Sequence, residues 1–576
     1  MVKGERLKVK GILLCFLSIL NFQFSICQAQ SDTALNRSVT VERDFQPVIR
    51  AAGKVSTKPV VMTTTIEPAP VEYSDYTADV TPEASLSPML SQPTRFAPGY
   101  VYDGYIRGAI GHPNTLFDFG YHLDDGKKSV LDVYAHHKAE WGKAALSKSI
   151  VGINFAHLYS TCDLYFGVNG GNLYYHRHGD LYEKNQENNT TNLWTTEVFL
   201  GIKSNAKQDF QYIAQTGYML FTKPGAVNEH QIRTKAAFDW HSDAHHVGAN
   251  VYVQNNLLQL GSLADVIPDS LVGNSHDIRI EPYYAYEGKR INLHLGINLD
   301  MNVGAGRNSL SSVENLSFAP SPHIRLEAQI AKPWLTLYAD IVGNHGSGSL
   351  QDYMEENRYK SIVHGIIDHH YASYTPVDAE LGFHIRPHRD LLIELHGGYA
   401  YMQKQTNLIY MPNGDFEFFY STYQRGKIGG QANYHYRDYV RVNLNGDYYI
   451  WRSDSLILDR PNWDLALRVD GRIDKHWSLY SENRFEGSRR ALAADGTVCR
   501  LKPRIDLNLG LQYEMWVGKQ SASRRMRSDA QVLKPEPKPN LVLFAQINDF
   551  IHRRNEIYLG YHTVGINFLI GATYRF

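Results

Sequence analysis

The chain ends in the stretch Gly565-Ile566-Asn567-Phe568-Leu569-Ile570-Gly571-Ala572-Thr573-Tyr574-Arg575-Phe576. Apolar side chains occupy every second position from Ile566 to Phe576, and the positions between are polar or glycine, with Leu569 as the one exception. Such alternation gives a β-strand one apolar and one polar face. An amphipathic strand that ends the chain on phenylalanine is typical of outer-membrane β-barrels. We therefore predict that Tyr574 and Phe576 are a membrane-insertion signature, which barrel-assembly machinery would bind through the C-terminal strand.

The same period of two extends over residues 99–576. In Ile291–Val303 every odd-numbered position is apolar and every even-numbered one is polar or glycine, and 440–450, 463–473 and 505–515 show the same pattern. Each stretch has about 10 residues, the length that a tilted strand needs to cross a bilayer. Strands of soluble β-sandwiches and propellers are shorter, at about 5–6 residues, and a packed core would not bury so many charges. We predict an all-β fold, a large transmembrane antiparallel β-barrel of about 22 strands.

Breaks between the alternating stretches predict the connections. The short polar breaks at 124–128 and 386–389 are typical of periplasmic turns. We expect external loops at the four longer polar insertions, which are 177–192, 260–275, 343–375 and 518–540. The last of these is basic and proline-rich, and we expect it to be a solvated loop rather than a ligand-binding patch.

Two segments precede the alternating region. Residues 1–29 have a basic start, an apolar run over 12–20 and small residues before a cut at Gln30, which together predict a secretory signal peptide. Lipidation at Cys27 is disfavoured because Phe24-Ser25-Ile26 is a poor lipobox. Residues 30–98 include seven prolines between 59 and 98, and this composition predicts an extended periplasmic arm. Residues 99–576 are the predicted barrel.

Composition narrows the function classes. The net charge of −1 marks no nucleic-acid partner. Tyrosine (38), phenylalanine (23) and tryptophan (8) are abundant, as expected for aromatic girdles at membrane interfaces. After the signal peptide no run of about 18 apolar residues occurs, so we expect no transmembrane helix. Cys162 and Cys499 remain in the mature chain, and both a disulfide and two free thiols are compatible with the sequence.

Histidine clusters at 136–137, 176–178, 241–246 and 369–370. No further ligands recur at a fixed spacing, so we predict polar lumen or interface residues, with no metal site and no cofactor. His345 and Ser347 are two positions apart and invite comparison with outer-membrane esterases. Alternation from Leu335 places both on the outer face, but the stretch is glycine-rich and opens a long loop. We therefore expect no enzymatic activity and no catalytic residues.

The polar face of the late strands is the remaining candidate site. In a wide barrel the inward side chains border the lumen, where charges bias passage by sign and size or pair with one another. The candidate lumen-lining residues are Arg441, Arg468, Asp470, Arg472, Asp506 and Glu514.

The end of the chain resembles the closing hairpin of TonB-dependent receptor barrels. The matching features are Leu541–Ile547, Asn548-Asp549-Phe550-Ile551, Arg553-Arg554, Gly560-Tyr561, Gly565 and the terminal 571–576. The resemblance implies a 22-stranded barrel around an N-terminal plug, with a TonB box near the mature N-terminus. The string Val39, Thr40, Val41 and Glu42 is similar to such a box. The roughly 70 residues before the barrel are too few for a full plug, in which respect the chain departs from the family.

Together these observations predict a transport or porin-like barrel in the outer membrane of a Gram-negative bacterium. The arm would either thread into the lumen or dock a periplasmic or lipoprotein partner at residues 31–98. The alternative is a non-transport scaffold barrel in a secretion, assembly or surface-lipoprotein complex. An open lumen and ion conductance would distinguish the two, and the sequence does not specify a substrate.

Overall fold

The computed structural model describes residues 103–125, 128–142, 145–176, 190–205, 209–267, 274–304, 318–331, 334–346, 348–356, 361–368, 373–412, 416–437, 439–517 and 539–576. The predicted signal peptide (1–29), the predicted arm (30–98) and the string Val39–Glu42 lie outside these residues. Among the described helices, none is long and apolar enough to cross a membrane.

Strands dominate the described chain. The first thirteen are β1 (Gly104–His112), β2 (Asn114–Asp124), β3 (Ser129–Glu140), β4 (Leu146–Leu158), β5 (Cys162–His176), β6 (Thr190–Ser204), β7 (Phe210–Lys223), β8 (Val227–Ser242), β9 (His245–Leu260), β10 (Ser275–Glu287), β11 (Ile291–Gly304), β12 (Phe318–Ala331) and β13 (Leu335–His345). The others are β14 (Tyr374–His388), β15 (Leu391–Tyr410), β16 (Phe416–Tyr436), β17 (Val440–Ser453), β18 (Trp463–Arg472), β19 (Trp477–Glu486), β20 (Arg489–Ala493), β21 (Val498–Leu501), β22 (Arg504–Met515), β23 (Leu541–Asn548), β24 (Glu556–Tyr558), β25 (Tyr561–His562) and β26 (Asn567–Arg575). The helices are η1 (Ser262–Asp265), α2 (Leu350–Glu356) and α3 (Ile362–Asp368).

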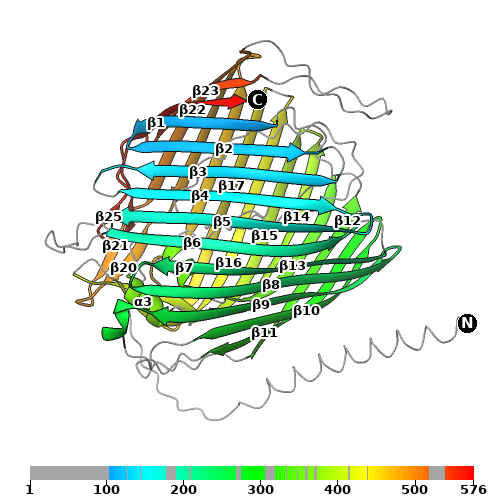
Figure 1. Ribbon diagram of the computed structural model, residues 1–576, viewed down its shortest axis with the longest axis horizontal. Coiled ribbons are helices and arrows are strands. Elements are labelled where there is room, and N and C mark those ends of the chain that lie inside the picture. The colour runs from blue at the N-terminus through cyan, green and yellow to red at the C-terminus, as the bar shows by residue number, and fades with distance from the viewer. Residues whose placement is uncertain are drawn as a thin grey trace, which may run out of the picture. The chain divides into compact units, whose positions relative to one another are not determined.

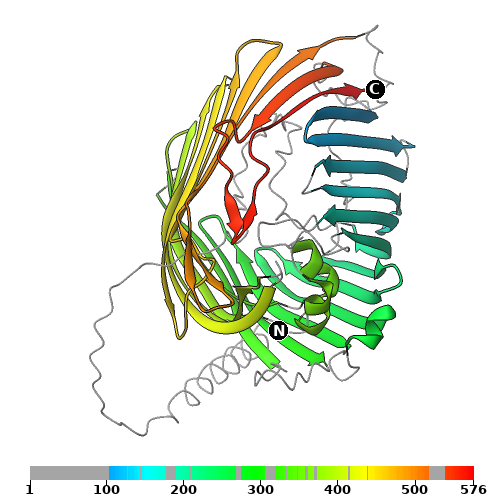
Figure 2. The ribbon, with the colours of Figure 1, turned by 90° about the vertical axis from the view of Figure 1, so that its left-hand side faces the viewer.

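The strands close into a ring (Figures 1 and 2). Each of β1 to β18 pairs antiparallel with the next strand, β19 pairs with β22, and the series continues through β23 and β26 back to β1. In the described chain, nineteen strands and these three make 22, which confirms the predicted count. The terminal residues complete the seam, because Gly104 and Phe576 exchange backbone hydrogen bonds of 3.0 and 2.9 Å. No edge strand of the ring is left unpaired.

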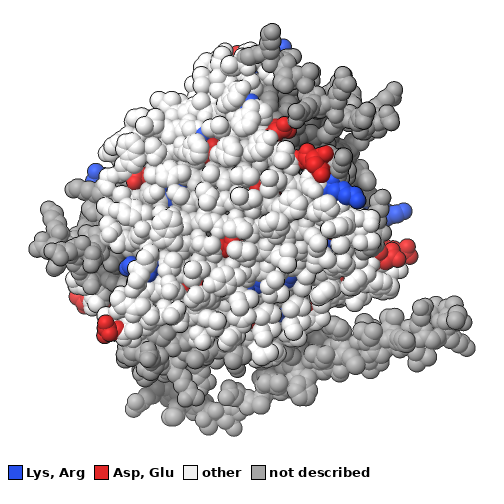
Figure 3. Space-filling model, in the orientation of Figure 1, with Lys and Arg blue, Asp and Glu red and all other residues white. Residues whose placement is uncertain are grey.

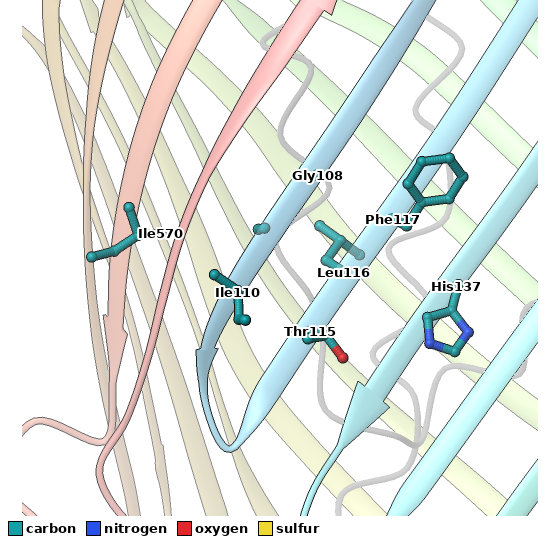
Figure 4. Close-up of a pocket in the computed structure, with 8 residues that line it drawn as sticks. Gly108, Ile110, Thr115, Leu116, Phe117, His137 and Ile570 are labelled. Atoms are coloured by element: carbon teal, nitrogen blue, oxygen red, sulfur yellow. The ribbon is translucent and has the colours of Figure 1, made fainter.

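The seam packs two backbones closely at one position. Gly111 faces Leu569 across it, and a Cβ added at Gly111 would lie only 1.7 Å from the carbonyl oxygen of Phe568. A Cβ added at Gly108 on the same strand would meet nothing within 4 Å. Gly108 instead lies in an open depression of about 500 Å³ on the outer wall, bordered by Ile110, Leu116, Phe117, His137 and Ile570 (Figure 4). Glycine is thus required by close packing at Gly111 and not at Gly108.

The outer face of the ring is apolar. On β26, Ile570 and Tyr574 are 58% and 43% exposed, whereas Leu569 between the outward residues is 5% exposed. Ile291, Leu295 and Met301 on β11 are likewise exposed. Figure 3 shows a mostly uncharged surface over the strands, with its larger charged patches near the ends. A closed barrel with an apolar exterior is suited to lipid, so the chain is an outer-membrane β-barrel.

The two ends of the barrel differ. The end that carries Gly104 and Phe576 has mostly short turns, such as the one between β8 and β9, and the other end carries the long connections after β5, β9, β11 and β13. In barrels of this kind the short turns are periplasmic and the long loops extracellular. The predicted turn at 386–389 lies at the periplasmic end, because the Arg386 amide donates to the carbonyl of Trp334 in the neighbouring turn.

One loop prediction is wrong. Asn540 accepts a hydrogen bond from the Val517 amide, and its carbonyl accepts one from the Arg575 amide, so the connection 518–540 leaves and re-joins the barrel at the periplasmic end. Its length and polarity resemble those of an external loop. Strand direction decides the side, however, and direction depends on how many preceding strands cross the wall. β22 is the twentieth strand to cross the wall, and like the other even-numbered crossing strands it ends at the end of the barrel that carries Gly104.

Segments of the extracellular connections fold back inside the ring and form two buried clusters (Figure 2). The helices α2 and α3 place Leu350, Met354, Ile362 and Ile366 against the inner ends of β5 to β8, where all four are buried. The hairpin β20–β21 packs with β15, β16 and the small β24–β25 sheet around Leu408, Tyr410, Phe416 and Tyr561. Because each buried apolar side chain contributes roughly 1.5–3 kcal/mol, both segments are held firmly in the extracellular mouth.

Candidate functional site

Charged side chains form groups of ion pairs across neighbouring strands. Arg468 on β18 lies 3.0 Å from the carboxylate of Asp470 and 3.6 Å from that of Glu482 on β19. Arg441 on β17 is directly opposite Asp470 in the strand register. Arg472 is exposed at the end of β18 and donates to the carbonyl of Asp474. Three of the predicted lumen residues therefore form one group of alternating charge, while Arg472 lies at its periplasmic margin.

Asp506 belongs to a second, more deeply buried group. Its carboxylate lies 2.7 Å from Arg504 Nε and accepts a hydrogen bond from the Asn555 amide at 2.6 Å. Arg504 also lies 3.7 Å from Glu486, and the side chains of that pair are each 5% exposed. Burial removes solvent screening, so these charges depend on one another. Glu514, the remaining candidate, is half-buried near the periplasmic end of β22, where its carbonyl accepts a bond from His476.

A third group lies on β13 to β17. Lys427 forms an ion pair with Glu380, and His396 Nε2 lies 2.7 Å from Asp447 and its Nδ1 3.4 Å from Glu394. The Tyr338 hydroxyl is 2.9 Å from Glu380 and 2.7 Å from Glu394, so it can donate to either carboxylate. These residues were not predicted from the sequence as a group. They come from five consecutive strands, and the strand register decides which of their side chains lie side by side.

Glu229 on β8 fixes the in-folded helix α2. Its carboxylate is fully buried and accepts backbone N–H bonds from Leu350 at 2.9 Å and Gln351 at 3.0 Å. The Gln231 side chain donates to the same carboxylate at 2.7 Å. Without these acceptors the first amides of α2 would be buried and unsatisfied. Glu229 therefore holds the segment that narrows the extracellular mouth.

A second support of helix α2 is more accessible to water. Lys148 on β4 lies 3.1 Å from Glu355, and the two side chains are 26% and 16% exposed. Such a partly solvated pair is worth at most about 1 kcal/mol. The Glu229 contacts are therefore the stronger of the two attachments.

The other in-folded region is held by Asp459 in the loop 454–462. Tyr410 donates to its carboxylate at 2.9 Å, and burial raises the pKa of the Asp459 carboxyl to about 6, although Arg489 opposes this shift. Arg489 is itself buried and donates to the carbonyl of Glu556 at 2.8 Å. The loop, the hairpin β20–β21 and β24 are thus joined through polar contacts as well as apolar ones.

The last strand, β26, pairs with β1 and so closes the barrel. Tyr574 points outward, and the Phe576 ring stacks on Tyr121 of β2 with ring centroids 6.2 Å apart. Cys162 and Cys499 are both free thiols.

His345 is not on the outer face that alternation predicted for it. The pairing of β13 with β14 is irregular between Val342 and Asn344, and beyond this point the side chain of His345 is buried. It lines an inner cavity of about 220 Å³ with Arg279 and Asp300. Ser347, its proposed partner, lies outside the described residues. A local irregularity of this kind changes the face of a strand without changing its sequence pattern.

No family model and no curated protein matches the chain. Among solved structures, the copper transporter OprC superposes with a TM-score of 0.61 at 13% identity, covering 82% of this chain and 80% of that one. The FrpB iron transporter from Neisseria meningitidis gives 0.60 at 10% identity, over 82% and 81%. The ferric enterobactin receptor PfeA from Pseudomonas aeruginosa gives 0.59 at 12% identity, again over 82% and 81%. These neighbours are TonB-dependent receptors, and the chain has their barrel fold.

Proposed function

We propose that this barrel carries a small polar solute across the outer membrane. The observation that supports this most is the inner wall, where groups of paired charges line a ring of 22 strands. A ring of that size is wide enough to enclose an aqueous path unless it is filled. Structural neighbours include a copper transporter and an iron transporter, which favours the same class of role. We infer no enzymatic activity.

The in-folded segments suggest that passage is controlled. Helices α2 and α3 and the hairpin β20–β21 occupy the extracellular mouth, each through its own buried cluster. Loops that fold inward narrow a pore and select by size and charge. A solute would therefore pass when one of these segments is displaced or would use the space that they leave.

The N-terminal arm would act from the periplasmic side. Residues 31–98 would either enter the lumen as a partial stopper or bind a periplasmic or lipoprotein partner, and Val39–Glu42 would be the segment to test for TonB binding. The barrel-assembly machinery would recognise the last strand through Tyr574 and Phe576.

Solute flux into proteoliposomes tests the proposal. The full-length mature chain is reconstituted, and uptake of labelled solutes of graded size and charge is followed, with empty liposomes as the control. Transport predicts uptake with a size limit and a preference for one sign of charge. Uptake no faster than in empty liposomes, for every solute tried, would contradict it.

The alternative is a scaffold barrel in a secretion, assembly or surface-lipoprotein complex. The narrowing of the extracellular mouth by the in-folded segments is the observation that favours it, since a scaffold needs no open path. A scaffold predicts no flux and a stoichiometric partner that co-purifies from the native membrane. The two functions are therefore separated by flux and by partner content in the same preparation.

A further inference from the structure

Three side chains that can bind a metal converge on the inner wall at β10, β11 and β12. They are Glu281, His294 and His323, and one ligand atom from each lies within 4.8 Å of the others. Glu281 Oε1 is 3.2 Å from His294 Nε2 and forms a hydrogen bond with His323 Nδ1. The Glu281 side chain is 9% exposed and the histidines are 22% and 20% exposed, so the cluster is held by the wall yet open to the lumen.

The strand register explains why these residues meet. His323 is directly opposite Gly296, His294 is two positions from Gly296 on the same face, and Glu281 approaches from the neighbouring strand. Gly296 leaves the centre of the group empty. A Cβ added there would lie 2.8 Å from Glu281 Oε1 and 3.2 Å from His294 Nε2. The space between the ligand atoms therefore depends on the absence of a side chain at this position.

No lysine or arginine balances the charge of the cluster. Within the described part of the chain, the Glu281 carboxylate contacts the two histidines and forms no ion pair with a lysine or arginine. Its second oxygen accepts a hydrogen bond from the Asn250 amide at 2.9 Å, which orients the carboxylate. The comparable group of Glu380, Glu394 and His396 differs, because Lys427 already neutralises Glu380.

The ligand chemistry identifies the class of ion. Imidazole nitrogen and carboxylate oxygen together suit zinc and its neighbours in the first transition series, whereas calcium and magnesium prefer oxygen alone. Zinc–ligand bonds of about 2.0–2.1 Å place two ligands of one ion roughly 3.3 Å apart. The separation of 3.2 Å between Glu281 and His294 already matches this value.

We propose that Glu281, His294 and His323 form a binding site for a divalent transition-metal ion, such as Zn²⁺, on the luminal wall of the barrel. Three protein ligands leave at least one coordination position open. That position faces the lumen, where water or a chelating solute can occupy it. The inference does not rest on the proposed transport function, because metal binding can be measured whether or not the barrel transports a solute.

Zinc binding by the purified full-length mature chain tests the site. After treatment with a chelator, Zn²⁺ affinity and stoichiometry are measured by equilibrium dialysis for the wild type and for His294→Ala, Glu281→Gln and Gly296→Val. We expect each variant to lose one zinc ion per chain or to bind it at least about tenfold more weakly. Glu281→Gln retains the shape of the side chain, and Gly296→Val leaves all three ligands present but fills the space between them.

His157→Ala is the matched control, because His157 contacts Ser129 and no carboxylate in the described chain. Folding of each variant is checked by heat-modifiable migration in gels. Zinc bound equally by the wild type and all three folded variants would overturn the proposal. An equal loss in His157→Ala would overturn it as well, since that result would indicate diffuse binding to histidines in general. Co²⁺ absorption provides a second readout, with a ligand-field spectrum expected only where the three ligands are intact.

Discussion

Replacing Glu229 by alanine should release helix α2 from the barrel wall. The buried carboxylate accepts the backbone amides of Leu350 and Gln351 at 2.9 and 3.0 Å. A buried donor that loses its acceptor costs about 1–3 kcal/mol. For the two amides we take about 2–4 kcal/mol, which shifts the docking equilibrium by a factor of about 30–1000. The packing of Leu350 and Met354 in their buried cluster is unaffected by the substitution and opposes complete release of the helix.

Hydrogen–deuterium exchange of residues 350–356 measures this shift directly. In Glu229→Ala, we expect the protection of the α2 amides to fall by that factor, with exchange in the wall strands unchanged. Glu355→Ala is the matched control, because its pair with Lys148 is partly exposed to solvent and is worth at most about 1 kcal/mol. Its effect should stay below about fivefold. Equal protection in Glu229→Ala and the wild type, or an equal loss in the control, would refute the role given to Glu229.

Three further substitutions test the seam, the buried charges and the loop 454–462. Gly111→Ala should prevent ring closure, because its Cβ would lie 1.7 Å from a backbone oxygen. Gly108→Ala should fold normally, because a Cβ at that position meets nothing within 4 Å. Heat-modifiable migration in gels, which distinguishes the folded barrel from the unfolded chain, compares the two variants. Arg504→Ala should lower the free energy of unfolding by about 3–5 kcal/mol in urea titrations, since it leaves buried carboxylates unpaired, and a loss below about 1 kcal/mol would count against that reasoning. Burial raises the pKa of Asp459 to about 6, so the folded state binds a proton more tightly than the unfolded chain does. The free energy of unfolding should therefore fall as the pH rises from about 4 to about 6. In Asp459→Asn, thermal unfolding measured over the same pH range should not show this fall.

Much of the fold followed from the sequence because lipid imposes a strict pattern. Each strand must present apolar side chains outward, so the outward positions of Ile291–Val303 and of the last strand are visible in the sequence itself. The strand number followed from counting such stretches. The pattern is local, however, and it carries no information on which residues of different strands lie side by side.

The features that were missed depend on that non-local information. Helices α2 and α3 are buried only because β5 to β8 offer an apolar patch inside the ring. His345 leaves the outer face predicted for it because the pairing of β13 with β14 is irregular before it, and no residue type in the sequence indicates this irregularity. Glu281, His294 and His323 lie on three strands, and His294 occupies an ordinary polar position in its own strand. With the register known, the signal would have been Gly296, with His294 two positions before it on the same strand and His323 directly opposite on the next strand.

Single-channel conductance in planar bilayers tests the transport proposal most directly. The full-length mature barrel and the same barrel without residues 31–98 are compared at equal protein amounts, after gel migration has shown that both are folded. If the interior is a solute path restricted by the arm, removal of the arm should increase the conductance. A barrel that is silent in both forms would contradict the transport proposal and would favour a scaffold that acts through a partner protein.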